Sequence, residues 1–283
     1  SGGADQALFS VATGGVLTFD SAPDYEAEIC GGDNSCVVVL QVTDGANTDT
    51  ITVTVNLQDV NEFSPVFGDA DGDGESSTAT ATPNENQQAV GTYAATDADG
   101  SATQTYSILT AEQNAASVDH DLFSVAGGGV LTFQASPNYE DAGCGAGDNS
   151  NTCAVVIQVT DGANTDTITV TVTVQDLNDE TPAFTSSGTP SINENVRNVL
   201  TLAASDTDAG DSATFAITGG ADSELFEIDG GTTLRFAAAA GANYESPGDA
   251  GTNNEYVVVV TATDTGANAV AQTITITIQD VNE

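Results

Sequence analysis

Asp176-Leu-Asn-Asp-Glu-Thr-Pro-Ala-Phe184 is the stretch around which this chain is organised. A matching phrase, Asp59-Val-Asn-Glu-Phe-Ser-Pro-Val-Phe67, stands earlier, and its opening returns as Asp280-Val-Asn-Glu283. Each copy follows a run in which Thr alternates with Val or Ile, and the two earlier copies contain a proline. Such a phrase is typical of a joint where one folded unit ends and another begins, so the sequence predicts an array of repeats.

The joints collect side chains that carry oxygen, and they contain neither His nor Cys. Oxygen ligands without imidazole or thiolate suit a hard cation, above all Ca2+. The joints are therefore the first place to look for a cation site.

The charge balance restricts the possible partners. The 283 residues include 42 acidic residues, two Arg, no Lys and one His, which gives a formal net charge of −40. Nucleic acid and anionic membranes are disfavoured, because almost no cationic side chain is present to replace their counterions. No apolar run approaches the roughly 20 residues that cross a bilayer, so we expect no membrane insertion of this segment. A folded chain this acidic needs bound cations or a salty medium, and both indicate an extracellular, secreted location.

Four cysteines form two close pairs, Cys30 with Cys36 and Cys144 with Cys153, at corresponding places in two repeats. Disulfides that close such small loops fit an oxidising compartment. Ligation of a metal by cysteine is the alternative, but no second pair and no His accompanies either pair within its repeat. The third repeat carries Gly248-Asp-Ala-Gly-Thr252 at this place, so each bridge is expected to be a local crosslink.

Short runs rich in β-branched residues recur along the chain, bounded by Gly, Asp, Asn or Pro. In the last run of each repeat, Thr alternates with Val or Ile, which puts one polar and one apolar face on a strand. These last runs are Thr50–Val55, Thr167–Val174 and Thr273–Ile278. Repeats two and three each hold about seven runs in roughly 100–115 residues, as immunoglobulin-like sandwiches do. The predicted fold is all-β, with tandem immunoglobulin-like Greek-key β-sandwiches.

Three units are expected, over residues 1–61, 62–178 and 179–283. The second and third have a front half, up to about Leu109 and Ile217, followed by a back half, whereas the first has only a back half. Half a sandwich cannot cover its inner face, and it leaves strand edges unpaired. The missing strands come either from an upstream part of the chain or from another chain by strand addition. Because the sequence contains no Met, we expect it to be a piece of a longer protein.

Several motifs recur in a fixed order along the repeats. They are Asn-Glu-Asn (84–86, 193–195), Asp-x-Asp (97–99, 206–208), a Tyr-Glu phrase (24–26, 138–140, 243–245), Thr-Asp (43–44, 160–161, 263–264) and the joint itself. In this order they resemble cadherin repeats, as in bacterial cadherin-like calcium-binding surface proteins and adhesins, over nearly the whole chain. The resemblance implies that Ca2+ ions sit between successive repeats and are held by both.

Carried over position by position, the resemblance implies a ligand set for each joint. Between the first and second repeats the implied ligands are Asp24, Glu26, Asp59, Asn61, Glu62, Asp97, Asp99 and Asp161. Between the second and third they are Glu85, Glu140, Asp176, Asn178, Asp179, Asp206, Asp208 and Asp264, with the carbonyl of Leu177. Crowded carboxylates repel one another unless a cation lies between them, so Ca2+ is expected to stiffen a loose string of repeats into a rod.

Further acidic residues are expected to form partial sites or an additional one. The partial sites are Asp44 at one end of the chain, and Glu194, Glu245, Asp280, Asn282 and Glu283 at the other. An insertion confined to the second repeat, Gly68–Glu75, adds Asp69, Asp71 and Asp73, which resemble the start of a calcium loop. An extra ion and a flexible acidic loop are both compatible with this insertion.

The expected function is a calcium-stiffened extender or adhesion segment of a large repetitive surface protein, without enzymatic activity. Its partners are expected to be neighbouring repeats of the same chain or identical chains. Two alternatives stay open, a filament subunit assembled by strand complementation and a module that binds surface glycans. The only His, His120, stands beside acidic residues on a predicted loop, which gives a Ser-His-Asp triad no support. Arg197 and Arg235 are expected at the surface, where they relieve local negative charge.

Overall fold

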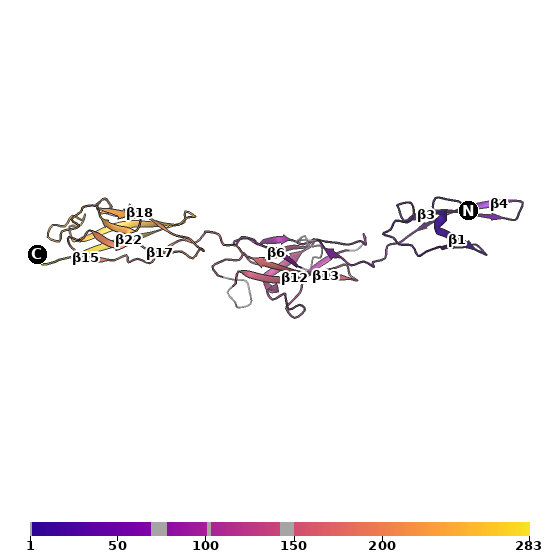
Figure 1. Ribbon diagram of the computed structural model, residues 1–283, viewed down its shortest axis with the longest axis horizontal. Helices are drawn as coiled ribbons and strands as arrows, with labels where there is room; N and C mark the ends of the chain where they lie inside the picture. Colours follow the sequence, from indigo (N-terminus) through magenta and orange to yellow (C-terminus); the bar gives the residue numbers. More distant parts are fainter. Residues whose placement is uncertain (1, 69–77, 101–102, 142–149) are drawn as a thin grey trace. The chain divides into compact units, whose positions relative to one another are not determined.

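The computed structural model describes residues 2–68, 78–100, 103–141 and 150–283, which form short strands joined by turns (Figure 1). The helical segments in these ranges are single 3-10 turns, η1 (Gln6–Leu8), η2 (His120–Leu122) and η3 (Ser223–Leu225). In the described part of the chain, no helix is both long enough and apolar enough to cross a membrane. The prediction of an all-β chain is confirmed.

The chain divides into two compact units. One comprises Ser1–Pro137 and Ala142–Val174, and the other comprises Asn138–Asp141 and Gln175–Glu283. The first unit therefore holds the predicted first repeat and most of the second, and the other unit holds the third. The finer boundaries at 61 and 178 stay predictions.

The third repeat, all of which is described, is a sandwich of two main sheets. The strand orders are β15-β22-β21-β18 and β16-β20-β19, and a short pair, β14-β17, accompanies them. The strands are β14 (Ala183–Phe184), β15 (Ser191–Asn193), β16 (Asn198–Thr201), β17 (Ala204–Ser205), β18 (Thr214–Gly219), β19 (Phe226–Asp229), β20 (Thr233–Phe236), β21 (Glu255–Thr263) and β22 (Ala269–Gln279). β15 lies parallel to β22, and β18 lies antiparallel to β21.

Alternation along the strands places the core of this sandwich. In β22 the side chains of Ile274, Ile276 and Ile278 are buried, and the residues between them are more exposed. The ring of Tyr256 meets that of Phe236 edge-on, with 5.2 Å between the centroids. Removing such side chains from water stabilises the fold by about 25 cal/mol per Å2 of apolar surface.

The second repeat has the same architecture. Its strand orders are β6-β13-β12-β9 and β10-β11-β7, with the short pair β5-β8. The strands are β5 (Val66–Phe67), β6 (Thr78–Ala81), β7 (Ala89–Thr92), β8 (Ala95–Thr96), β9 (Thr105–Ile108), β10 (Phe123–Ala126), β11 (Val130–Phe133), β12 (Thr152–Thr160) and β13 (Thr165–Thr173). β6 lies parallel to β13, as β15 does to β22.

The first repeat consists of two hairpins near the N-terminus (Figure 1). β1 (Phe9–Ala12) pairs with β2 (Val16–Phe19), and β3 (Ser35–Thr43) pairs with β4 (Thr48–Asn56). Within the described residues neither hairpin gains a third strand, and only an isolated bridge joins Gly2 to Val39 of β3. The hairpins correspond to β10-β11 and β12-β13 of the second repeat.

Cys30 and Cys36 form a disulfide, and both side chains are buried at the start of β3. Cys153 is buried at the equivalent place on β12. Its predicted partner, Cys144, lies outside the described residues, so the second bridge stays a prediction.

In the third repeat, hydrogen bonds shape the loop at Gly248–Thr252, which corresponds to the disulfide loop of the first repeat. The buried carboxylate of Asp249 accepts the backbone N–H of Asn253 at 3.0 Å and that of Asn254 at 3.2 Å. A buried acceptor with two donors thus takes the place that a crosslink has in the first repeat.

A buried Asp before each 3-10 turn ties that turn to the adjacent long strand. The carboxylates of Asp5, Asp119 and Asp222 accept the backbone N–H of Val37, Ala154 and Val257 at 2.7–2.8 Å. Gly220, two residues before the last of these, has φ +104° and lies so close to β21 that a Cβ would stand 2.5 Å from the Val257 oxygen. Gly3 repeats this geometry with φ +108°. The phrase Gly-Gly-Ala-Asp at 2–5 and 219–222 therefore marks where the chain meets a long strand, a signal that the sequence analysis missed.

Candidate metal centres

Acidic loops at the ends of the strands form the candidate centres. In the first unit, Asp97 and Asp99 follow β8, and Asp161 lies in the turn between β12 and β13. Each offers a carboxylate oxygen, and these oxygens lie within 4.8 Å of one another. The turn orients Asp161, because its Oδ1 accepts the backbone N–H groups of Ala163 and Asn164 at 2.7 and 2.6 Å.

A second group in the same unit shares one of these residues. Carboxylate oxygens of Glu26, Asp59 and Asp99 also lie within 4.8 Å of one another. Asp99 therefore belongs to both groups, and its Oδ2 accepts the backbone N–H of Phe63 at 2.8 Å. The joint phrase 59–63 and the Asp-x-Asp loop, far apart in the sequence, meet at this carboxylate.

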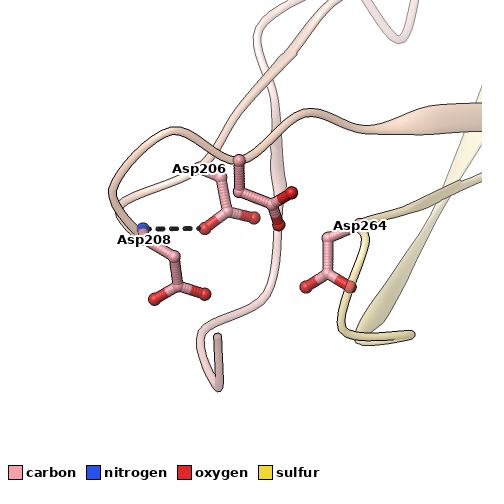
Figure 2. A group of neighbouring side chains, drawn as sticks. Asp206, Asp208 and Asp264 are labelled. Atoms are coloured by element: carbon pink, nitrogen blue, oxygen red, sulfur yellow. Dashed lines mark hydrogen bonds between the residues drawn. The ribbon is translucent and has the colours of Figure 1, made fainter. Parts of the chain in front are cut away.

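In the other unit, four aspartates form a comparable group. Oxygens of Asp206, Asp208, Asp211 and Asp264 lie within 4.8 Å of one another. Figure 2 shows that Asp206 and Asp208 come from one loop and face Asp264, which follows β21 on another segment. The backbone N–H of Asp208 donates to Asp206 Oδ1 at 3.1 Å, which fixes the turn of the Asp-x-Asp loop.

The joint phrase of this unit lies against the same loop. Asp176 Oδ2 accepts the backbone N–H of Ala209 at 2.8 Å, and the Asn178 amide donates to Asp211 Oδ2 at 2.8 Å. Oxygens of Glu140, Asp179 and Glu180 form one more group within 4.8 Å. These bonds place the joint residues beside the Asp-x-Asp loop.

Sequence reasoning missed Asp211 and Glu180. Asp211 has no acidic counterpart in the second repeat, where the stretch after Asp99 reads Gly-Ser-Ala-Thr, so a search for recurring positions could not find it. Its side chain accepts the Thr265 hydroxyl at 2.7 Å. This hydrogen bond is the largest cause that lowers the pKa of Asp211.

Two carboxyl groups of the acidic clusters have a raised pKa. Exclusion from water raises the pKa of Asp208, and the charges of Asp206, Asp176 and Asp179 raise it further. Exclusion from water also raises the pKa of Glu26, with Glu62, Asp59 and Asp99 adding repulsion. Carboxylates this close together disfavour one another's ionisation, and a cation bound between them would favour the ionised form.

Several carboxylate oxygens of these groups are buried and accept no hydrogen bond from the described part of the chain. They are both Oε atoms of Glu26, and Asp97 Oδ2, Asp99 Oδ1, Asp176 Oδ1, Asp206 Oδ2 and Asp208 Oδ1. A buried carboxylate oxygen without a donor is costly, and contact with a cation removes that cost. Hard oxygen ligands are the kind that Ca2+ takes, six to eight at a time, so the residues present fit this ion.

The other predicted ligands lie in several environments. Glu85 is buried, whereas Asn61 and Glu62 are exposed in the joint. Asp24 is exposed, and its Oδ1 accepts the backbone N–H of Glu26 at 3.1 Å. Leu177 is partly exposed. Asp69, Asp71 and Asp73 lie outside the described residues, so the extra site stays a prediction.

The predicted partial sites differ from one another. Glu194 is buried and accepts the backbone N–H groups of Tyr244 and Val281, each at 2.9 Å, and these bonds lower its pKa. Asp44 is exposed and caps its own turn through Ala46 and Asn47. The remaining members, Glu245, Asp280, Asn282 and Glu283, are exposed.

His120 and the two arginines take structural positions. The ring Nδ1 of His120 lies 3.0 Å from the backbone oxygen of Ser117, while the Ser117 hydroxyl accepts the N–H of Val156. The serine oxygen and the imidazole therefore do not form a nucleophile and base pair. Arg197 and Arg235 both bond to Glu227 on the surface of the third repeat.

No family model and no curated protein matches the sequence. Solved structures do match it. The human desmocollin-1 ectodomain aligns with a TM-score of 0.57 and 20% identity, over 98% of this chain and 53% of that one. Mouse protocadherin-24 EC1-3 aligns with a TM-score of 0.57 and 20% identity, over 98% and 89%. The protocadherin gammaB7 EC3-6 cis-dimer structure aligns with a TM-score of 0.63 and 20% identity, over 96% and 66%.

The likeness extends along nearly the whole chain, although the chain spans only about half the length of the desmocollin-1 ectodomain. At about 20% identity the likeness concerns the fold. It confirms the expectation of immunoglobulin-like sandwiches in tandem. The chain therefore has the fold of cadherin ectodomain repeats.

Proposed function

We propose that this chain is an extracellular, calcium-stiffened extender or adhesion segment of a larger repetitive surface protein, and that it has no enzymatic activity. The observation that carries the proposal is the set of buried carboxylate oxygens without donors in the acidic groups at the strand ends. A hard divalent cation is the partner that satisfies several such oxygens at once.

The residues that would hold Ca2+ come from segments far apart in the sequence. In the first unit, Glu26 and Asp59 belong to the first repeat, whereas Asp99 belongs to the loop after β8. A cation bound by all three would crosslink the end of one repeat to the start of the next. Without a cation, the repulsion that raises the pKa of Glu26 acts to separate these segments.

A stiff joint explains how repeats of this size could serve as an extender. Units that contact only their neighbours form a long body whose stiffness depends on each connection. Coordination replaces carboxylate repulsion at the connection, and the proline of the joint, Pro65 or Pro182, removes a backbone donor and limits rotation. The chain then carries a load or presents a distant site without any catalytic group.

The test compares the chain with Ca2+ and after chelation. With Ca2+ at a hundredfold excess over Kd, each site should stabilise its repeat by about 2.7 kcal/mol, which raises Tm by about 10 °C or more. Small-angle X-ray scattering should change from a flexible to a rod-like profile. Mg2+ at the same concentration should act weakly, because it demands a tighter octahedral shell.

A matched pair of variants assigns the effect to the acidic groups. Asp208→Asn removes one charge from the group around Asp206, whereas Asp121→Asn removes one from a side chain that is 91% exposed. The first should reduce the calcium-dependent rise in Tm, and the second should leave it unchanged. If the Tm and the scattering profile of the parent chain are the same with Ca2+ and after chelation, the proposal is rejected.

A further inference from the structure

One asparagine in the loop before β3 links two segments that carry proposed cation ligands. The side-chain amide of Asn34 donates to the backbone oxygen of Tyr25 at 2.8 Å. The backbone oxygen of Asn34 accepts the N–H of Leu57 at 2.9 Å. Tyr25 directly precedes Glu26, and Leu57 stands two residues before Asp59. Asn34 therefore ties the Glu26 segment to the Asp59 segment through two hydrogen bonds.

The third repeat contains the same connection. The side-chain amide of Asn254 donates to the backbone oxygen of Tyr244 at 3.0 Å. The backbone oxygen of Asn254 accepts the N–H of Ile278, also at 3.0 Å. Tyr244 directly precedes Glu245, and Ile278 stands two residues before Asp280. The relation between the Tyr-Glu phrase, the asparagine and the joint therefore occurs in both units of the chain.

The position of this asparagine is kept although the length of the loop varies. The asparagine follows the tyrosine by nine residues in the first repeat and by ten in the third. In the second repeat, the backbone oxygen of Asn151 accepts the N–H of Val174 at 2.8 Å, and Val174 again stands two residues before the joint aspartate. The contact with the strand that leads into the joint is therefore independent of loop length.

The first and third repeats support the asparagine by different chemistry. Asn34 lies inside the small loop that the disulfide of Cys30 and Cys36 closes. In the third repeat, the buried carboxylate of Asp249 accepts the N–H of Asn254 at 3.2 Å. Both asparagines have a left-handed backbone, with φ of +55° and +63°, which asparagine tolerates better than most residues. The crosslink and the carboxylate thus support the same local geometry.

The amide oxygen of each asparagine shows what the side chain contributes. Asn34 Oδ1 and Asn254 Oδ1 are buried and accept no hydrogen bond within the described ranges. A buried oxygen without a donor is unfavourable, and glycine would adopt the positive φ without one. The backbone conformation alone would therefore favour glycine at both positions. What asparagine adds is the hydrogen bond to the carbonyl oxygen that precedes the glutamate.

This connection acts against the repulsion between carboxylates. Oxygens of Glu26, Asp59 and Asp99 lie within 4.8 Å of one another. Like charges at this separation repel, so the two segments need a fixed connection to stay close before a cation binds. A site whose ligands are already in place loses less conformational freedom when it binds.

We propose that Asn34 is a positioning residue for the acidic group of Glu26, Asp59 and Asp99. Its amide fixes the loop that carries Glu26 against the strand that leads to Asp59, so that a cation meets ligands that are already assembled. Asn254 makes the equivalent connection in the third repeat. This inference rests on the proposed function, because it concerns cation binding at that group.

The experiment follows calcium binding at this group by a local signal. Hydrogen exchange of residues 57–64 is measured by mass spectrometry in the full chain at increasing Ca2+ concentration. These residues report on the group because the N–H of Phe63 donates to Asp99. Asn34→Gly removes the amide and keeps the left-handed backbone. The calcium concentration at half-maximal protection should rise about tenfold, as expected when a residue that orients a metal ligand is lost.

Two further variants separate the amide from the loop around it. Asn34→Ala removes the same amide without the backbone freedom of glycine, and should raise the calcium midpoint to a similar extent. Ser35→Ala removes a hydrogen bond of the same loop, from Ser35 Oγ to Asn56 Oδ1 at 2.8 Å, and should leave the midpoint unchanged. Exchange of residues 36–42 in chelator, compared with the parent chain, shows whether the hairpin β3-β4 still folds. If it does not fold in the glycine variant, the alanine variant decides alone.

Several results would overturn the role of Asn34. They are an unchanged midpoint in its variants, a rise only in a folded glycine variant, and an equal rise in the Ser35→Ala variant. Loss of the hairpin in both Asn34 variants would also overturn it, because the residue would then be needed for folding. If the parent chain shows no calcium-dependent protection in any peptide, the proposed function fails and this inference fails with it.

Discussion

The hairpins β3-β4 and β12-β13 contain the same sequence in different surroundings. Residues 41–55 and 158–172 are identical, and both segments form two antiparallel strands with the same register across the turn. Even the turn is repeated, since Asp44 and Asp161 each accept two backbone N–H groups that lower the carboxyl pKa. Burial differs, because β12-β13 has a strand on each side, whereas β3-β4 has none among the described residues. The local sequence determines that the hairpin forms, and distant segments determine whether its apolar face is buried.

The largest expected difference between the hairpins concerns equivalent isoleucines. Ile168→Ala should destabilise the second repeat by about 2–5 kcal/mol, because it leaves a cavity in a packed core. Ile51→Ala should change stability by no more than about 0.5 kcal/mol, since its side chain is mostly in water. Denaturant unfolding of the two variants measures both values. Similar losses from the two substitutions would mean that another segment or molecule covers Ile51 in solution.

A smaller effect is expected from the crosslink of the first repeat. Cys30→Ser with Cys36→Ser removes a short loop closure, which on the chain-entropy model costs about 2–3 kcal/mol. The loss should be confined to the hairpins of residues 2–61, which are two-stranded within the described residues. Limited proteolysis of parent and variant would show cleavage within residues 20–35 of the variant alone. Cleavage that spreads into residues 150–174 would contradict this confinement.

The smallest difference is expected between the two turn aspartates. Asp161→Asn removes a charge from the group with Asp97 and Asp99, and should weaken calcium binding roughly tenfold. Asp44→Asn changes an identical turn, but Asp44 is exposed, whereas Asp161 is buried beside Asp97 and Asp99. Titration calorimetry should therefore give the Asp44→Asn variant the calcium affinity of the parent chain. Equal weakening by both substitutions would show that the turn, and not the group, controls the affinity.

The sequence was sufficient for the strands because their pattern is local. Alternation of Thr with Val or Ile predicts β4, β13 and β22, and the structure confirms each of them. The acidic loops were also found from recurring motifs, and the structure brings Asp97, Asp99 and Asp161 together. Their role as ligands stays a prediction.

What the sequence could not provide depends on contacts between distant segments. Asp211 joins its group only because the loop after β17 folds back toward Thr265. The buried Asp before each 3-10 turn, such as Asp222, has its acceptor role only once Val257 lies beside it. The exposure of Val42 does not follow from its neighbours in the sequence, which are those of the buried Val159, and only the expected lack of a front half in the first repeat predicted it.

Asp99 belongs to two acidic groups of the first unit, one with Asp97 and Asp161 and one with Glu26 and Asp59. Under the proposed function, an ion in either group would hold this side chain in place for the other. The second ion would then bind to a preorganised site, so occupancy would rise cooperatively over a narrow range of calcium concentration. The joint would then be rigid above a threshold calcium concentration and flexible below it.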